Sequence, residues 1–346
     1  MENNMRDQNP FSNLIDLANE RIGGKALLTN DDFFASKNNL VKAAEPVFIP
    51  GKYTPKGKWM DGWESRRRRT PGHDWCILKL GVPGQIEGVN VDTTFFTGNY
   101  PEHFSLEALY SSKVLSLESL KKGNLQWTEI IKKSPLKSSA PNFYPVEIQG
   151  TWSHLRLNIY PDGGVARLRV FGKVKPDWER LSKSKTPLEL TAIHNGSKVI
   201  ACNDNHYGSM HNLILPGRAL NMGDGWETKR KRGPGHDWAL LELGTTGNIR
   251  KIEVDTNHFK GNYPDSCSIE ACRYDERNLS PETLDNLRGV EWVEVLPPTK
   301  LKAHHRHFFE KELTSKAKEG AFDYVRLNIF PDGGVSRLRA YGFPKL

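Results

Sequence analysis

Two short blocks of the sequence carry carboxylates, an imidazole and indoles in the same order. Residues 61–75 read DGWESRRRRTPGHDW and residues 224–238 read DGWETKRKRGPGHDW, identical at 11 of 15 positions. Histidine titrates near neutral pH and carboxyl groups exchange protons, so these residue types suit general acid–base chemistry. We predict that a glutamate and a histidine act as acid and base while the adjacent aspartate orients the histidine: Glu64, His73 and Asp74, and in the second block Glu227, His236 and Asp237. In the structural alternative, the tryptophans fill a core and the other residues hold a loop.

A second repeated segment is rich in arginine. Residues 156–172 (RLNIYPDGGVARLRVFG) return as residues 326–342, with 13 of 17 positions identical. If residues 161–164 form a hairpin turn, Arg156 faces Arg169 and Asn158 faces Arg167. The guanidinium group matches a carboxylate at two points, so we predict a clamp for a small carboxylate. The second copy of this clamp is Arg326, Asn328, Arg337 and Arg339. The alternatives are a solvated polar face and arginines paired with structural carboxylates.

Basic runs occupy residues 66–69 (RRRR) and 229–232 (KRKR). Only alternate side chains of a strand face one way, and Arg67, Arg69, Arg230 and Arg232 are the positions kept as arginine in both copies. We expect Arg67 and Arg230 to bind substrate while the neighbours of these arginines point to solvent. The formal net charge of +8 suits either a nucleic-acid binder or an enzyme that collects a small anion. Acidic residues lie beside every basic run, which favours the small anion.

The sequence contains no clear metal site. His304, His305 and His307 cluster, but the aligned stretch of the first copy, residues 139–142 (SAPN), has no histidine. The four cysteines lack metal or redox spacing, and three of them align with apolar residues, which predicts buried free thiols. These patterns require no cofactor, and a divalent metal stays open.

A duplicated domain holds these residues. The repeated blocks keep their order at offsets of 163 residues for the middle blocks and 170 residues for the last, too long for a solenoid. Residues 173–186 (KVKPDWERLSKSKT) are polar, charged and contain proline, as linkers do. We predict a first domain over residues 1–172, a linker over residues 173–186 and a second domain over residues 187–346.

The secondary-structure signal is mostly a period of two. Phe104, Leu106 and Ala108 alternate with polar residues, as do the apolar residues of segments 89–92 and 154–159, which predicts half-buried strands. Short strands separated by Gly, Pro, Asn and Asp favour an antiparallel sandwich or jelly roll in each copy. We expect an all-β protein made of two tandem repeated jelly-roll β-sandwiches with few short helices, near residues 11–21 and 280–287.

Membrane and targeting signals are weak. No stretch reaches the roughly 18 uninterrupted apolar residues of a membrane helix, and the N-terminal residues lack the pattern of a signal peptide. We therefore expect a cytoplasmic protein without membrane contact. The C-terminal Pro344-Lys345-Leu346 differs from the peroxisomal Ser-Lys-Leu signal at its first position, which makes a peroxisomal location the alternative. A homo-oligomer is expected from general tendency.

A third block, residues 91–101 (VDTTFFTGNYP) and 254–264 (VDTNHFKGNYP), completes the pattern. Together the three duplicated blocks resemble the allantoicase family over residues 30–342. This resemblance implies a tandem pair of jelly rolls related to galactose-binding-like sandwiches. It also implies hydrolysis of allantoate to ureidoglycolate and urea in purine degradation. Allantoate is a small carboxylate with two ureido groups on its alpha carbon, and the arginines, asparagines and carboxylates of the blocks fit it.

Two other classes of protein are consistent with parts of the sequence. A non-catalytic tandem lectin-like sandwich would bind sugar without releasing urea, and the duplicated Arg, His, Asp and Glu set argues against it. A nucleic-acid binder would lose affinity steeply with salt, and the acidic neighbours of the basic runs argue against it. The copies differ at His103 against Ser266 and at Phe33 against His206, which leaves open which copy is active.

Overall fold

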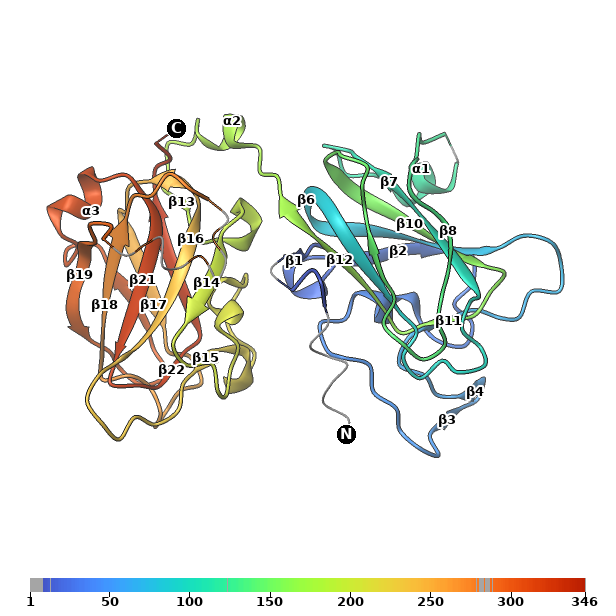
Figure 1. Ribbon diagram of the computed structural model, residues 1–346, viewed down its shortest axis with the longest axis horizontal. Coiled ribbons are helices and arrows are strands. Elements are labelled where there is room, and N and C mark those ends of the chain that lie inside the picture. The colour runs from blue at the N-terminus through green and yellow to red at the C-terminus, as the bar shows by residue number, and fades with distance from the viewer. Residues whose placement is uncertain are drawn as a thin grey trace. The chain divides into compact units, whose positions relative to one another are not determined.

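The computed structural model describes residues 9–12, 14–122, 124–277, 279, 283, 287 and 289–345. The chain forms two compact units, Met1–Lys175 (unit 1) and Pro176–Leu346 (unit 2) (Figure 1). Both are built from strands, and the described helices are short: α1 (Leu117–Lys121), α2 (Trp178–Leu181) and α3 (Ser315–Glu319), with 3₁₀ turns η2 (Glu20–Ile22), η3 (Lys37–Val41), η4 (Ile193–Asn195), η5 (Met210–Ile214) and η6 (Met222–Asp224). The all-β prediction is confirmed.

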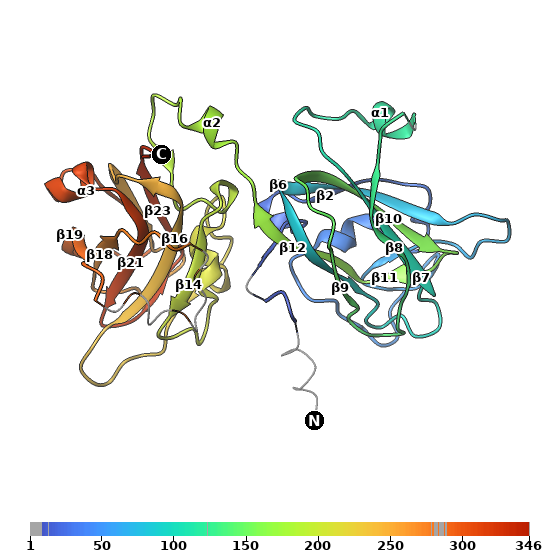
Figure 2. The same cartoon turned by 45° about the horizontal axis from the view of Figure 1, so that its top comes forward.

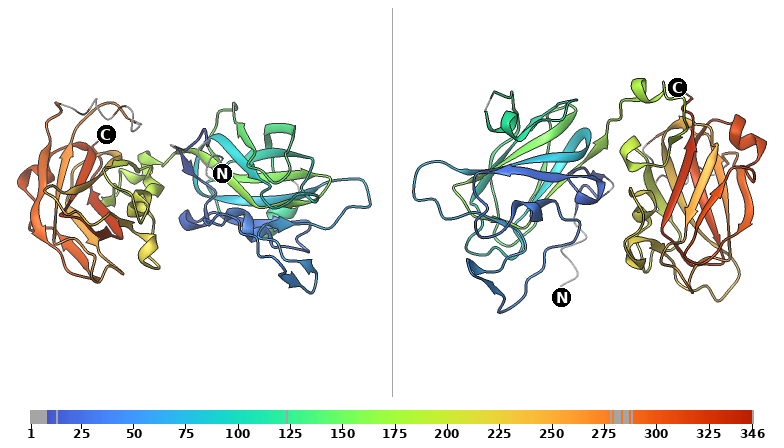
Figure 3. Two further views of the ribbon diagram at one scale, coloured as in Figure 1. Left: turned by 60° about the horizontal axis from the view of Figure 1, so that its bottom comes forward. Right: turned by 180° about the vertical axis from the view of Figure 1, so that it is seen from behind.

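Unit 1 is an antiparallel sheet folded into a sandwich about one long strand, β6 (Asp74–Asp92). The first part of β6 pairs with β2 (Lys25–Thr29) and β10 (Trp152–Tyr160), and β7 (His103–Leu109) and β8 (Thr128–Pro135) extend this layer. The second part pairs with β12 (Arg167–Val174) and β9 (Phe143–Pro145), and β1 (Ile15–Asp16) flanks β12. Two short pairs complete the unit: β5 (Trp63–Glu64) with β11 (Gly164–Val165), and the ribbon of β3 (Tyr53–Thr54) and β4 (Gly57–Lys58), which stands away from the sandwich (Figure 3).

Unit 2 repeats this plan with the long strand divided into β16 (Asp237–Gly247) and β17 (Lys251–Asp255). One sheet has the order β14 (Lys198–Cys202), β16, β21 (Phe322–Phe330), β18 (Ser266–Cys272) and β19 (Val293–Lys300), which can be followed in Figure 2. The other has the order β13 (Leu188–Glu189), β23 (Arg337–Gly342), β17 and β20 (Arg306–Phe309). The short strands β15 (Trp226–Glu227) and β22 (Gly334–Val335) pair as β5 and β11 do.

The predicted alternation is confirmed in the core. Phe104, Leu106 and Ala108 of β7 are fully buried, and so are the alternate residues Leu155, Leu157 and Ile159 of β10. The indoles of Trp63 and Trp226 are buried too, and each donates its Nε1–H to a backbone carbonyl at 2.8 Å. The structural interpretation therefore holds for these two tryptophans. The predicted burial of thiols is confirmed for Cys76, Cys267 and Cys272, while Cys202 is half-buried.

The predicted hairpin between residues 156 and 169 is wrong. Arg156 pairs with Ile77 of β6 and Glu107 of β7, whereas Arg169 pairs with Asn90 in the other part of β6. The intervening residues 164–165 pair with β5, and the Ala166 N–H donates to the carbonyl of Asp92, so the chain crosses between layers and does not fold back. In unit 2, β21 and β23 likewise belong to different sheets.

The helix predicted over residues 11–21 is also wrong. Ile15–Asp16 is a short strand paired with β12, and only the 3₁₀ turn Glu20–Ile22 follows it. The helix predicted over residues 280–287 falls mostly outside the described residues. Among the residues that the structure describes, no helix is long and apolar enough to cross a membrane.

Candidate active site

A pocket of about 350 Å³ opens on the outer face of the β2-β6-β10-β7-β8 layer of unit 1, and we call it the sheet pocket. Strand register gathers its lining. Asn158 of β10 lies between Trp75 of β6 and Ser105 of β7, and Arg156 lies beside Glu107. Because side chains alternate along a strand, these polar groups share the face opposite the buried leucines. The lining residues are His73, Trp75, Ser105, Glu107, Glu129, Arg156, Asn158 and Tyr160.

A continuous hydrogen-bond network crosses the floor of the sheet pocket. Arg156 donates from Nε and Nη2 to the two carboxylate oxygens of Glu107, at 2.5 and 2.6 Å. Asn158 Nδ2 donates to Glu107 Oε2 at 2.9 Å and to Ser105 Oγ at 3.1 Å. The Ser105 hydroxyl lies 3.0 Å from the Tyr160 hydroxyl. Each polar group is therefore held in place by at least one partner.

Electrostatics keep the glutamate of this network ionised. Burial alone would raise the pKa of Glu107, but hydrogen bonds from Arg156 and Asn158, with the charge of Arg156, lower it overall. The guanidinium carbon of Arg156 also lies 5.1 Å from the centre of the Trp127 ring. The aromatic face and the carboxylate together fix the orientation of the arginine.

His73 lies at one end of the sheet pocket, with its ring centre 4.7 Å from that of Tyr160. It precedes β6, whose first residue, Asp74, donates its N–H to the carbonyl of Pro161 at 3.1 Å. This bond ties the loop that carries His73 to the turn that follows Tyr160. The predicted residues His73, Arg156 and Asn158 therefore meet in one pocket.

Unit 2 carries the same set at matching register. Arg326 donates from Nε and Nη2 to Glu270 Oε2 at 3.0 and 2.7 Å, and Asn328 Nδ2 donates to the same oxygen at 3.0 Å. The pKa of Glu270 is lowered, because hydrogen bonds from Asn328 and Arg326 outweigh its burial. The ring centres of His236 and Phe330 lie 4.9 Å apart with the planes tilted by 39°, and the rings of His73 and Tyr160 are tilted by the same angle.

The predicted acids Glu64 and Glu227 lie beside the turn that ends β10 or β21, rather than in the lining of the sheet pocket. Glu64 accepts a hydrogen bond from Asn99 Nδ2 at 2.6 Å, and burial raises its pKa although this bond opposes the rise. In unit 2, Asn262 donates to Glu227 in the same way. This turn contacts the neighbours of both the acid and the histidine. Ser65, which follows Glu64, donates its N–H to Gly163 O at 3.1 Å, and Asp74, which follows His73, donates its N–H to Pro161 O.

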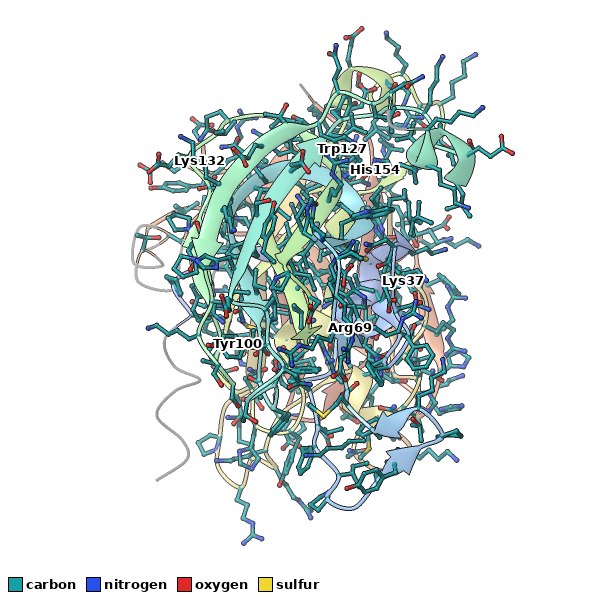
Figure 4. All side chains as sticks on the ribbon, turned by 90° about the vertical axis from the view of Figure 1, so that its right-hand side faces the viewer. Lys37, Arg69, Tyr100, Trp127, Lys132 and His154 are labelled. Atoms are coloured by element: carbon teal, nitrogen blue, oxygen red, sulfur yellow. The ribbon has the colours of Figure 1, made fainter. Side chains whose placement is uncertain are left out.

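At this loop end, unit 2 has a second pocket of about 740 Å³, which we call the loop pocket. Its lining includes Glu227, Arg230 and Lys231 of the duplicated block, and Tyr207, Thr228, Gly261, Asn262, Tyr263, Asp265, Pro331, Asp332 and Gly333. The same loop end of unit 1 lies low in Figure 4, where Arg69 and Tyr100 are labelled. Trp127 is labelled near the opposite, upper end of the sheet. The structure thus brings Arg230 together with Glu227.

Asp74 is predicted to orient His73, but its side chain bonds to other residues. Asp74 accepts hydrogen bonds from Asn30 Nδ2 at 2.8 Å and Arg68 Nη1 at 2.6 Å, and its Oδ2 is buried without a partner. Asp237 repeats this arrangement, with Lys231 Nζ at 2.9 Å and an unpartnered buried Oδ2. Both aspartates therefore anchor the basic loop.

The basic run does not follow the predicted alternation. Residues 65–69 form no strand, and Arg68, expected to face solvent, turns inward to Asp74. Arg66 pairs with Asp31 at 2.7 Å, while Arg67 and Arg69 are exposed. Arg67 thus lies on the surface of the loop and is not among the described residues that line the sheet pocket.

Arg167 and Arg169 are buried away from the sheet pocket, in the other layer. Arg167 donates to the backbone carbonyls of Ala44 and Asp61 at 2.9 Å and to Asp61 Oδ2 at 2.7 Å. Arg169 donates to the carbonyls of residues 42–44. Arg337 and Arg339 are buried in the same way and bind carbonyls of residues 215, 217 and 224. The predicted four-residue clamp is therefore not formed, and the structural alternative describes these arginines.

The histidine cluster of residues 304–307 is held by the backbone. His307 donates from Nδ1 to the carbonyl of Val254 at 3.0 Å and accepts from Lys302 N–H at Nε2, at 2.8 Å. His304 Nδ1 accepts the N–H of His258 at 2.8 Å. Among the described residues, no group of three or more His, Cys, Asp and Glu side chains could hold a metal ion.

Sequence reasoning missed Ser105, Glu107, Glu129 and Tyr160 of the sheet pocket. A signal was present, because Ser105 and Glu107 return as Ser268 and Glu270 between the buried residues of the matching strand. Their significance depends on the pairing of β7 with β10, which joins residues about fifty positions apart.

Two antiparallel jelly-roll sandwiches in tandem, each with an Arg–Glu–Asn–Ser network on one outer face, place the chain in the class of duplicated β-sandwich proteins. The model of the allantoicase repeat matches residues 15–175 and 188–345, so the chain belongs to the allantoicase family. It is 46% identical to a probable allantoicase of Pseudomonas paraeruginosa, over 98% of this chain and 99% of that protein. It is 47% identical to the allantoicase of Dictyostelium discoideum, over 95% of this chain and 86% of that protein.

Solved structures agree with this membership. A structure of allantoicase shares 34% identity, with a TM-score of 0.78 over 96% of this chain and 94% of that chain. The crystal structure of allantoicase from Saccharomyces cerevisiae also shares 34% identity, with a TM-score of 0.76 over 95% of this chain and 93% of that chain.

Proposed function

We propose that this protein hydrolyses allantoate to ureidoglycolate and urea. The observation that carries the proposal is the match to a solved allantoicase over 96% of the chain, spanning both units. The test is incubation of the purified chain with allantoate, with urea and ureidoglycolate measured as products. No product under varied metal supply would favour the non-catalytic lectin-like alternative.

The reaction needs an acid and a base but no covalent nucleophile. The oxygen of water becomes bonded to the alpha carbon of allantoate, and the bond from that carbon to one ureido nitrogen breaks. The departing nitrogen takes up a proton to give urea, and the incoming water loses one. One group that donates a proton and one that accepts a proton can carry both transfers.

For unit 1 we assign the proton transfers to Glu64 and His73, with the proton of Glu64, which lies outside the lining of the sheet pocket, passed to the substrate through a water molecule. Burial raises the pKa of Glu64, so it retains its proton to higher pH than an exposed glutamate and can serve as the acid. His73 lies in the sheet pocket and can serve as the base. Glu227 and His236 are the corresponding pair in unit 2.

Binding of substrate is assigned to the network on the sheet. Two donors of Arg156 contact Glu107, which leaves others of its five N–H groups for the substrate carboxylate. Asn158, Glu107 and Glu129 supply acceptors for ureido N–H groups. Arg67 is proposed to approach the carboxylate from the exposed loop, and Arg326, Asn328 and Arg230 take these roles in unit 2.

Three further expectations stay predictions. The first is a cytoplasmic or peroxisomal location, and the second is a homo-oligomeric state. Activity without a required cofactor is the third, with a divalent metal left open, and dialysis against a chelator followed by the urea assay tests it. Loss of urea release that Mn²⁺ or Zn²⁺ restores would establish a metal requirement.

A further inference from the structure

The matching sites of the two units differ by one oxygen atom and one cation. Tyr160 of unit 1 is replaced by Phe330, so the hydroxyl that contacts Ser105 at 3.0 Å has no counterpart. Lys133 Nζ lies 4.7 Å from the centre of the Tyr160 ring, and the β7–β8 register aligns Lys133 with Pro298. The Arg–Glu–Asn–Ser network and the histidine that packs against the ring are present in both units.

The hydrogen bonds of unit 1 leave a donor for a ligand. Ser105 Oγ accepts a hydrogen bond from Asn158 Nδ2 at 3.1 Å, so the serine's own hydrogen is available to the Tyr160 oxygen. In that arrangement the Tyr160 hydrogen is not used within the network. Tyr160 lines the sheet pocket, and the ring of His73 at 4.7 Å fixes the ring that carries this hydroxyl.

In unit 2 the same serine has no hydroxyl partner on the ring. Ser268 Oγ accepts from Asn328 Nδ2 at 3.3 Å, and Phe330 supplies only carbon atoms. The site retains its guanidinium, its carboxylate and His236. It can thus hold a carboxylate ligand of the same class while lacking one donor.

We propose that the Tyr160 hydroxyl donates a hydrogen bond to the ureido group of the substrate in the sheet pocket, and that its loss at Phe330 makes unit 1 the faster of the two sites. This inference rests on the proposed function. The bond is made to the departing ureido group as its C–N bond to the alpha carbon breaks, so it stabilises the transition state more than the bound substrate. The proton itself is supplied by the acid of the proposed mechanism.

The test compares kcat and KM for allantoate in the full chain and in Tyr160→Phe, Phe330→Tyr and the double exchange. Tyr160→Phe should lower kcat by about fivefold, because one neutral hydrogen bond changes the rate of a site about tenfold and the unit 2 site already lacks it, with KM changed by less than about threefold. Phe330→Tyr should raise kcat above that of the parent, by up to about twofold because a second site becomes competent. The double exchange should recover part of the activity that Tyr160→Phe loses.

Circular dichroism and the thermal midpoint show whether each variant is folded. A folded Tyr160→Phe with the parent kcat would overturn the inference, and so would a Phe330→Tyr variant whose kcat does not rise. The kcat of Phe330→Tyr tests the inference even if Tyr160→Phe does not fold. If the parent releases no urea from allantoate, the proposed function fails, and that failure is visible before any variant is made.

Discussion

Arg156 and Glu107 form a two-point ion pair across neighbouring strands, with Nε–Oε2 at 2.5 Å and Nη2–Oε1 at 2.6 Å. The pair is only partly exposed, because 31% of the arginine side chain and 19% of the glutamate side chain are accessible. Arg326 and Glu270 form the corresponding pair in unit 2, where Nε and Nη2 of the guanidinium group both donate to Oε2. A guanidinium already held in place can receive a substrate carboxylate without first being ordered, which reduces the entropic cost of binding.

Replacement of Arg156 by lysine should separate geometry from charge. Lysine keeps the positive charge but cannot contact two carboxylate oxygens in a plane, so we expect KM for allantoate to rise by about tenfold. Steady-state kinetics measure this change. Arg326→Lys is the matched control in unit 2, and an unchanged KM in both variants would remove these arginines from the binding site.

Replacement of His73 tests the base. His73→Ala should slow the unit 1 site by about a hundredfold or more, because general acid–base catalysis contributes about 10²–10⁴ in rate, so the kcat of the chain should fall to that of unit 2, about a tenth of the parent value. If unit 1 is the faster site, His236→Ala should have a smaller effect on kcat. Equal urea release by folded His73→Ala and parent enzyme would contradict the assignment.

Replacement of Glu64 tests the acid through the pH dependence of kcat. Burial raises the pKa of Glu64 above its ordinary value, and a general acid works only while protonated. Activity that depends on this proton should therefore fall as the pH rises through the raised pKa. Glu64→Gln should lower the kcat of the chain to that of unit 2, about a tenth of the parent value, and remove the fall that unit 1 contributes to the pH profile. A profile that keeps its alkaline fall in the variant would assign that fall to another group, and Glu227→Gln provides the comparison in unit 2.

Sequence patterns predicted the faces of the strands better than their partners. A period of two decides which side of β10 is buried wherever β10 lies, so Leu155 and Leu157 were assigned correctly. Pairing depends on distant segments: Gly163 exchanges hydrogen bonds with Ser65, 98 residues earlier, and this contact carries the chain to the other layer. The same non-local pairing brings Glu107 to Arg156, and only the structure could reveal it.

The stability contributed by Glu107 should be sensitive to acid. Burial would raise its pKa, but hydrogen bonds from Arg156 and Asn158 and the charge of Arg156 lower it below the ordinary value of 4.5. A carboxyl whose folded-state pKa is lowered adds stability above its unfolded-state pKa and loses that stability as the pH falls through the folded-state pKa.

Glu107→Gln should therefore lower the free energy of unfolding by about 1–2 kcal/mol at pH 7, the value of a partly buried charged pair. The difference between variant and parent should shrink as the pH falls below the ordinary value of 4.5 and through the lowered folded-state pKa, because the parent loses its pair there. Urea unfolding across this pH range measures it, and a difference that stays constant with pH would contradict the linkage.

Arg167 should matter for stability rather than for substrate binding. Its side chain is 1% exposed, and it bonds to Asp61 Oδ2 at 2.7 Å and to three backbone carbonyls. Arg167→Met leaves Asp61 buried with one partner fewer, so the free energy of unfolding should fall by about 3–5 kcal/mol. Arg67→Met, on the exposed loop, should change it by less than about 0.5 kcal/mol. Urea unfolding compares the two variants, and the KM of the remaining folded Arg167→Met should stay within about twofold of the parent. A variant of parental stability with a strongly raised KM would instead place Arg167 in the binding site, as the sequence first suggested.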